Sequence, residues 1–204
     1  AARNSQPFNR SSRARTLSPC ASRLSEIASR SAAGPMARRA SGVIRAMVVR
    51  FMKSSTFNPL ENRAELDRWI LSRLHSLVAE TNEAMDAYEP TRAFRATSDF
   101  VVDELSNWYV RLSRRRFWKG AMGDDKLAAF QTLRECLDTV ARLIAPLAPF
   151  FAEQLYRDLN GAAGSVHWSR FPEANEALID RDLERRMALA QRMTSLVLSL
   201  RKKE

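Results

Sequence analysis

Glycine and proline are scarce in this 204-residue chain, which contains 6 and 8 of them. Long stretches free of these turn-forming residues favour helices over a sandwich or barrel of many short strands. Cysteine is scarcer still, and Cys20 and Cys136 form no C-x-x-C pair, so the sequence indicates neither a zinc knuckle nor a disulfide framework. We therefore expect a protein without a metal site that works in a reducing compartment.

A long hydrophobic run is missing as well. The most apolar stretch, residues 143–152, contains Pro146 and Pro149 and is ten residues long, whereas a helix that spans a bilayer needs about 20. With 45% hydrophobic residues and a net charge of +10, the chain is neither collagen-like nor acidic nor wholly disordered. These features predict a soluble, cytoplasmic protein that makes no membrane contact.

The excess positive charge is confined to the first part of the chain. Residues 1–58 carry 11 basic side chains and 1 acidic one, while residues 59–204 carry 22 of each. Because residues 1–58 are rich in arginine, serine and alanine and have little apolar patterning, we expect a disordered arm. Three origins compete: an organellar presequence, a basic nucleic-acid arm, or a stretch never selected to fold, such as a cloning remnant or out-of-frame translation.

The third origin of this arm is favoured. The arm begins Ala-Ala-Arg instead of with methionine, and the patterning changes abruptly near Asn58-Pro59. A presequence is the second choice and would imply an organelle. On the favoured interpretation, residues 1–58 are not native to the family of the remaining chain, and residues 59–204 form the folded domain.

Apolar side chains at helical spacing predict the elements of residues 59–204. Asn62 and Glu65 have the spacing of a capping box, and the stripe after them predicts a helix to about Tyr88. Pro90 suits a first helical turn and begins a second helix, which runs to Trp118. Three more helices are predicted: from Asp124-Asp125 to Pro146, from Phe150 to Leu159 with a left-handed cap at Asn160-Gly161, and from Leu183 to Glu204.

Each apolar stripe can be buried only against its neighbours. The fold class that we predict is all-α, an antiparallel bundle of four to five helices preceded by the disordered basic arm. About 146 residues are enough for such a domain, which buries roughly 68–70% of the surface of its unfolded chain. The last helix ends without a cap, so we expect the bundle to be truncated at its C-terminal end.

Aromatic and basic residues concentrate in residues 106–119, within the second predicted helix. At 100° per residue, Trp108 lies in line with an apolar stripe that includes Leu105 and Leu112, so we assign Trp108 to the core. A side strip is formed by Asn107, Arg111, Arg114 and Trp118, with Arg115 and Arg116 flanking the apolar stripe.

This side strip has two interpretations. Arginine forks pair with phosphate and aromatic rings stack on unpaired bases, so the strip suits an RNA stem-loop. Alternatively, the arginines pair with carboxylates of neighbouring helices, such as Asp99, Asp103 or Glu104. The sequence leaves both interpretations open.

Four blocks of residues 59–204 carry a family resemblance. They are Glu61 to Ser72, Tyr88-Glu89-Pro90-Thr91, Ser106 to Trp118, and Ala145 to Glu153 together with Ser165-Val166-His167. In these blocks the chain resembles the anticodon-binding helical domain of class I aminoacyl-tRNA synthetases, specifically the isoleucyl-tRNA synthetase family. Pro-x-x-Pro-Phe is shared by the synthetases for large aliphatic amino acids, whereas Asn-Trp-Tyr followed by Arg-Arg-Arg-Phe-Trp points to the isoleucine branch.

The catalytic signatures of that family are absent. His75 and His167 lack the neighbours of His-x-Gly-His, and residues 52–55 lack the second lysine of Lys-Met-Ser-Lys-Ser. No Ser-His-Asp or metal-ligand arrangement suggests another chemistry. We therefore assign no catalytic residue, cofactor or metal to this chain and interpret it as a fragment. The resemblance implies ATP and Mg²⁺ for the full-length parent enzyme.

The resemblance implies recognition of an anticodon stem-loop within an isoleucine–tRNA ligase. It implies an isoleucine tRNA and the catalytic domain of the parent synthetase as partners, and we expect a monomer. The candidate RNA-binding residues are Asn107, Arg111, Arg114, Arg115, Arg116, Trp118, Lys119, His167, Arg201, Lys202 and Lys203. The alternative function is a stand-alone helical module that binds RNA or protein and uses the basic arm for affinity.

Overall fold

The computed structural model describes residues 59–119, 123–161 and 164–201. Within these ranges the chain forms helices and turns and has no β-strand, which confirms the all-α prediction. Our predictions for the arm, residues 1–58, and for Lys202 and Lys203 lie outside the described residues. No helix in the described part of the chain is long and apolar enough to cross a membrane.

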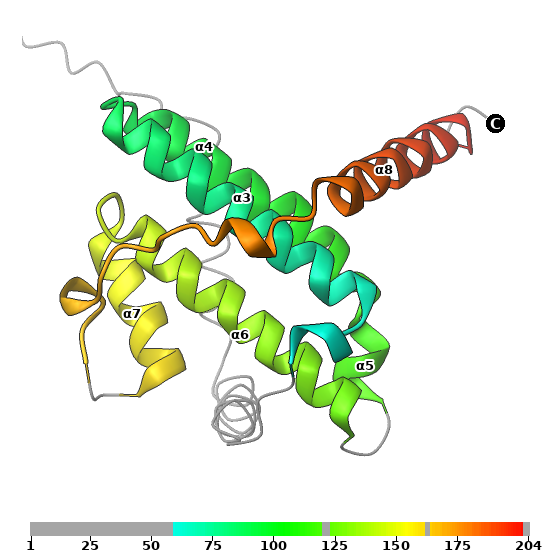
Figure 1. The fold of residues 1–204 in the computed structure, drawn as a ribbon, viewed down its shortest axis with the longest axis horizontal. Coiled ribbons are helices and arrows are strands. Elements are labelled where there is room, and N and C mark those ends of the chain that lie inside the picture. Colours follow the sequence, from blue (N-terminus) through cyan, green and yellow to red (C-terminus); the bar gives the residue numbers. More distant parts are fainter. Residues whose placement is uncertain (1–58, 120–122, 162–163, 202–204) are drawn as a thin grey trace, which may run out of the picture. The chain divides into compact units, whose positions relative to one another are not determined.

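The elements follow one another along the chain as Figure 1 shows. The 3₁₀ turns are η1 (Leu60–Asn62), η3 (Val166–Trp168) and η4 (Glu176–Leu178), and η2 (Phe100–Val110) is a π-helix. The α-helices are α3 (Glu65–Asp86), α4 (Pro90–Asp99), α5 (Arg114–Trp118), α6 (Asp124–Ile144), α7 (Pro149–Asn160) and α8 (Arg181–Arg201).

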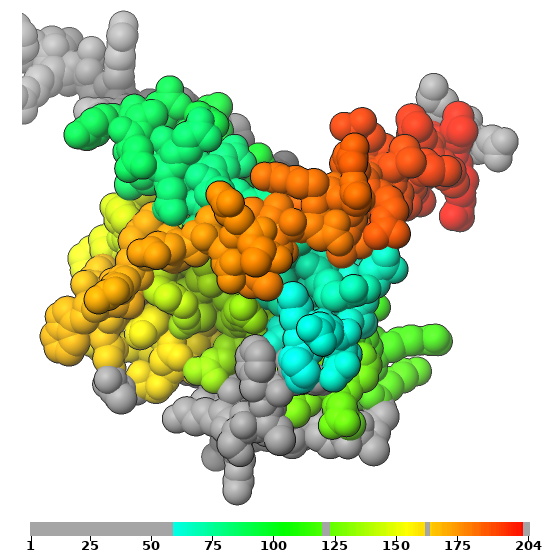
Figure 2. Space-filling view, in the orientation of Figure 1, coloured from blue at the N-terminus to red at the C-terminus, as the bar shows by residue number. Residues whose placement is uncertain are grey.

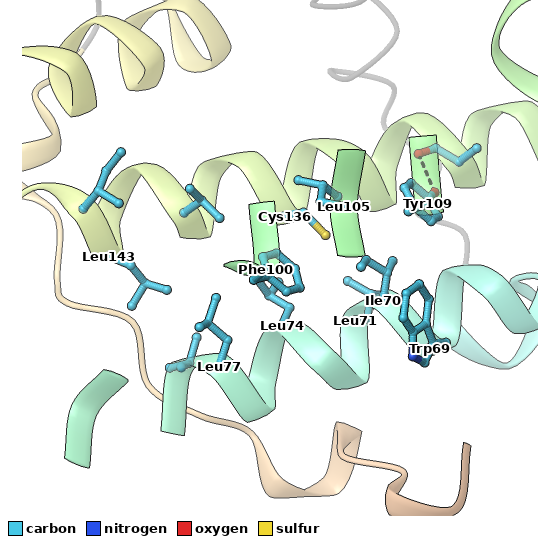
Figure 3. Packing of buried hydrophobic residues seen from close by; sticks show 14 of the residues in the cluster. Trp69, Ile70, Leu71, Leu74, Leu77, Phe100, Leu105, Tyr109, Cys136 and Leu143 are labelled. Carbon is cyan, nitrogen blue, oxygen red and sulfur yellow. Dashed lines mark hydrogen bonds between the residues drawn. The ribbon is translucent and has the colours of Figure 1, made fainter. Parts of the chain in front are cut away.

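Helix α3 lies at the centre of the packing and contacts α4, η2, α6 and α8. Its apolar residues recur at helical spacing, so one stripe faces the other helices. Trp69, Ile70, Leu74 and Val78 are completely buried, and Figure 3 shows Ile70 and Leu74 on the side of α3 that faces Cys136 of α6. The long, uninterrupted stripes thus predict α3 and α6 correctly, and the structure adds that these two helices pack against each other.

The capping box predicted at Asn62 and Glu65 is wrong. Asn62 belongs to the turn η1, and α3 begins after Ala64 without a side-chain cap. The reason is Arg63, whose buried guanidinium donates to Thr132 Oγ1 of α6 at 3.1 Å. To place that side chain inside, the chain winds into a 3₁₀ turn, which removes Asn62 from the N-cap position.

The second predicted helix is divided into α4, η2 and α5. A π-helix has i→i+5 hydrogen bonds, so each of its turns contains more residues than an α-helical turn and the faces shift. Consequently Tyr109 is 0% exposed, while Trp108 is half-buried and only packs against the core. Leu112, which we placed on the core stripe, is 55% exposed.

Helices α6 and α7 form a hairpin close to the predicted positions. Pro149 stands in the first turn of α7, where its missing N–H costs nothing. Gly161 follows α7 with φ of +80°, so the residue has the predicted positive φ, but its ψ of −177° is extended and is not that of a left-handed helical cap. Residues 164–180 then run back across α3, where Asn82 Nδ2 donates to Pro172 O at 3.2 Å, and Figure 2 shows this segment as an orange band.

Helix α8 departs from the prediction that every stripe is buried. Its first turn is fixed to α3, since Leu183 is buried and Ser72 and Ser76 donate to Glu184 Oε1 at 2.6 and 2.7 Å. Met187 is partly buried against the core, whereas the apolar side chains beyond it are exposed: Leu189, Met193, Leu196, Val197 and Leu200. Nothing within the described ranges covers these side chains.

Candidate nucleic-acid interface

A buried ion pair holds the segment of greatest interest in place. Asp67 of α3 is completely buried, and both of its carboxylate oxygens accept from the Arg116 guanidinium at 2.8 Å. The Tyr109 hydroxyl donates to Asp67 Oδ1 at 2.8 Å. Arg116 also binds Asp125 at the start of α6. The cluster thereby ties α5 and η2 to α3 and α6.

The same cluster shifts the titration of its members. Hydrogen bonds to Asp67 and Asp125 outweigh partial burial and raise the pKa of Arg116 above its usual value. Burial, and then the negative charge of Asp67, raise the pKa of the Tyr109 hydroxyl. Arg116 therefore stays charged and Tyr109 stays neutral, as the hydrogen bonds require.

Arg116 pairs with carboxylates inside the bundle, as the second interpretation of the side strip predicted. Its partners are Asp67 and Asp125, although we had named Asp99, Asp103 and Glu104. Glu104 instead accepts from Arg73 of α3, at 2.8 and 2.9 Å. RNA contact by Arg116 stays a prediction, and its donors are already used within the bundle.

The other basic residues of the segment lie on the surface. Arg111, Arg114 and Arg115 are exposed and form no ion pair with any residue that the structure describes. Asn107 and Lys119 are exposed as well. Because no carboxylate among the described residues pairs with these three arginines, their charge can bind an external anion.

Trp118 is held at the edge of this basic surface. The ring is 67% exposed and packs edge-on against Phe117, with 6.1 Å between ring centroids. Phe117 is itself buried beside Phe130, at 5.1 Å. A buried ring thus fixes one side of Trp118 and leaves the other side open to solvent.

A turn at Ser113 keeps these residues together. The Ser113 N–H donates to Tyr109 O at 2.9 Å, and its carbonyl accepts from the Phe117 N–H at 3.1 Å. The chain therefore follows a nearly helical path from η2 into α5. We define the α5 surface as Arg111, Arg114, Arg115 and Trp118.

The remaining candidates lie elsewhere. His167 is exposed on η3, which packs against α7, whereas α5 packs against α6. Figure 1 shows α5 and α7 near opposite ends of α6. Arg201 is the last residue of α8 and is exposed. The structure thus does not bring His167 to the α5 surface.

The sequence analysis did not single out buried Asp67 or exposed Trp168. Asp67 is a lone carboxylate between Leu66 and Trp69, and its position on a core stripe was the available signal. Trp168 is 86% exposed in the loop after His167. The signal in the sequence was that Trp168 belongs to no apolar stripe and lies close to His167 and Arg170. No group of three or more metal-binding side chains occurs in the described ranges.

Comparisons with known proteins point in the same direction. Residues 67–204 match the family described as the anticodon-binding domain of tRNA ligase. The chain is 58% identical over 149 residues to the isoleucine–tRNA ligase of Cytophaga hutchinsonii and 55% identical over 150 residues to that of Bacteroides fragilis. It is 49% identical over 144 residues to that of Dehalococcoides mccartyi.

These alignments cover much of the chain and little of the relatives. The first two include 71% of this chain and 13% of the relative, and the third includes 68% and 14%. The chain therefore corresponds to one part of a much longer protein in those organisms.

Proposed function

The chain belongs to the family of anticodon-binding domains of tRNA ligases, and from this premise we propose that its bundle binds the anticodon stem-loop of a tRNA. The observation that carries the proposal is the α5 surface, where three arginines that pair with no described carboxylate lie beside an exposed tryptophan. Other arginines of the bundle, such as Arg63, Arg73 and Arg116, bind carboxylates.

The chemistry of the α5 surface fits an RNA loop. A guanidinium binds a phosphate through two parallel hydrogen bonds, and an indole ring stacks on an unpaired base. The Asp67–Arg116 pair holds α5 in place before RNA arrives, so less conformational entropy is lost on binding. Phosphate contacts would position the RNA, and the stacked base would carry the discrimination.

We further propose that the tRNA is an isoleucine acceptor and that the bundle acts within an isoleucine–tRNA ligase, which is what the similar proteins are called. In such a ligase, ATP with Mg²⁺ activates isoleucine, which is then transferred to the end of the tRNA. The residues described here would hold the anticodon arm and would perform neither step. We expect the parent protein to work as a monomer in the cytoplasm.

The test is RNA binding by the full chain. Synthetic stem-loops with the anticodon arms of isoleucine and valine tRNAs are titrated across salt concentrations. Arg111→Ala and Arg114→Ala should weaken both RNAs alike and make the salt dependence shallower by roughly 0.7 to 0.9 per lost phosphate contact. Trp118→Ala should cost about 1–3 kcal/mol and reduce the preference for the isoleucine stem-loop.

Arg95→Ala is the matched control. Arg95 is also exposed and has no ion pair with a described residue, but it lies on α4, away from the α5 surface. Its loss should leave the salt dependence unchanged. If the triple variant of Arg111, Arg114 and Trp118 is folded and binds as the unaltered chain does, the α5 surface is not the RNA site.

A further inference from the structure

A second aromatic and basic surface lies beyond the other end of α6. The loop 164–171 contains His167, Trp168 and Arg170 and has no acidic residue. Trp168 is 86% exposed, so its large ring contributes almost nothing to the core. Exposed aromatic rings of this size are typical of interaction surfaces.

The backbone beneath this ring is firmly held. Glu153 of α7 accepts from Ser165 Oγ at 2.8 Å and from the Val166 N–H at 2.9 Å, and the Trp168 N–H donates to Ser165 O at 3.2 Å. The Val166 side chain is buried in the core. These contacts fix the turn that carries Trp168 without covering the ring, and such preorganisation lowers the entropic cost of binding.

One unpaired positive charge, that of Arg170, lies two residues after Trp168 in the same loop. A groove of about 220 Å³ separates the loop from the turn between α6 and α7, and its polar lining includes Arg142, His167 and Arg170. Arg170 is exposed and forms no ion pair with any residue in the described ranges. The carboxylates of Asp138 and Glu153 are already paired, with Arg142 and Arg157 respectively. Because Arg142 is itself paired with Asp138, Arg170 supplies the positive charge of the groove that no described carboxylate neutralises.

We propose that the Trp168 surface, defined as Arg142, His167, Trp168 and Arg170, is a second RNA contact of the bundle. An unpaired base stacks on the Trp168 ring, and the Arg170 guanidinium binds the adjoining phosphate. An apolar protein partner would not require the uncompensated arginine, so the charge favours a polyanion. This inference rests on the proposed function and adds a second site to it.

The distance between the α5 surface and the Trp168 surface determines how large an RNA must be to contact both. Helix α6 has 21 residues and separates α5 from α7, so at 1.5 Å per residue the two surfaces lie about 30 Å apart along its axis. One RNA that touches both must contact them with different parts of its structure. The α5 surface and the Trp168 surface therefore make independent contributions to binding.

The experiment measures binding of the full chain to the isoleucine anticodon stem-loop at about 150 mM salt, where nonspecific attraction is screened. Trp168→Ala should weaken binding by roughly 5- to 150-fold, which corresponds to 1–3 kcal/mol per stacked base. Trp168→Phe should retain most of the affinity, because a phenyl ring can still stack. Arg170→Ala should make the salt dependence shallower by roughly 0.7 to 0.9.

Phe150→Ala is the matched control, since Phe150 is an equally exposed aromatic residue that lies on α7, outside the loop 164–171 that carries Arg170. It should bind RNA as the unaltered chain does. The melting temperature of Trp168→Ala should be unchanged, because the ring is exposed.

The outcomes separate this inference from the proposed function. If Arg114→Ala weakens RNA binding and Trp168→Ala does not, the α5 surface stands and the second contact is wrong. If Trp168→Ala binds RNA normally but no longer binds another segment of the parent ligase, the surface is a protein interface and the inference is again wrong. If the unaltered chain binds no RNA, both proposals are wrong.

Discussion

Arg116 and Asp67 face each other across 49 residues of sequence, and both carboxylate oxygens lie 2.8 Å from a guanidinium nitrogen. Asp67 is fully buried, and Arg116 is largely so. The pair connects the segment of greatest interest for function to the centre of the core.

Breaking this pair should be strongly destabilising. Asp67→Ala leaves the Arg116 charge without its buried partner, so we expect the free energy of unfolding to fall by about 3–5 kcal/mol. Urea denaturation followed by circular dichroism measures it. Asp182→Ala is the control, because its partner Arg185 is exposed and such pairs contribute at most about 1 kcal/mol. Equal losses in both variants would contradict a structural role for Asp67.

Because of the π-helix, we expect Tyr109 to contribute more to stability than its neighbour Trp108, the reverse of what a regular α-helix predicts. Tyr109→Ala should lower the free energy of unfolding by about 3–5 kcal/mol, because its ring is fully buried. Trp108→Ala should cost clearly less, since Trp108 is half-buried at the margin of the core. Thermal denaturation of the two variants gives the order. If Trp108→Ala lost more stability than Tyr109→Ala, Trp108 would face the core, as a regular α-helix predicts.

The Ser113 hydroxyl is buried and has no hydrogen-bond partner among the described residues. A buried polar group without a partner is costly, and its replacement by a smaller apolar group can be neutral or stabilising. Ser113→Ala should therefore leave the melting temperature unchanged or raise it. Ser165→Ala is the contrasting variant, because that hydroxyl donates to Glu153. A loss of stability in Ser113→Ala would mean that its hydroxyl is satisfied after all.

Glu153 should make the Trp168 loop sensitive to acid. Hydrogen bonds from Ser165 and Val166 hold the pKa of its carboxyl below the usual 4.5. Because the folded state has the lower pKa, its contribution to stability is complete above the ordinary pKa and is lost as the pH falls through the folded one. The Val166 amide should thus be protected from hydrogen exchange at neutral pH and lose protection in that acidic window.

Glu153→Gln provides the control for this pH dependence. A neutral amide oxygen still accepts a hydrogen bond but does not titrate, so the acid-dependent loss of protection should vanish. An amide that behaves identically in both proteins would show that Glu153 does not control the loop.

The helical spacing of apolar residues predicted those parts of the fold that depend only on residues close together in sequence. The stripes of α3 and α6 and the end of α7 at Gly161 follow from residues close together in sequence, and all three were found as expected. The exposed arginines at 111, 114 and 115 were also candidates from the start. Their exposure, and their lack of an ion pair, became visible only when the carboxylates of neighbouring helices had positions.

Other features depend on long-range packing and cannot be predicted from the local spacing of apolar residues. A 3.6-residue repeat assumes one kind of helix, so the π-helix η2 moved Tyr109 inward and Leu112 outward against expectation. The partner of Arg116 and the burial of Arg63 depend on residues dozens of positions away, because an ion pair needs only proximity in space. By itself, the sequence determined the all-α class, most helices and the family resemblance. Only the tertiary structure decided which charged side chains form ion pairs inside the bundle and which remain exposed to bind a partner.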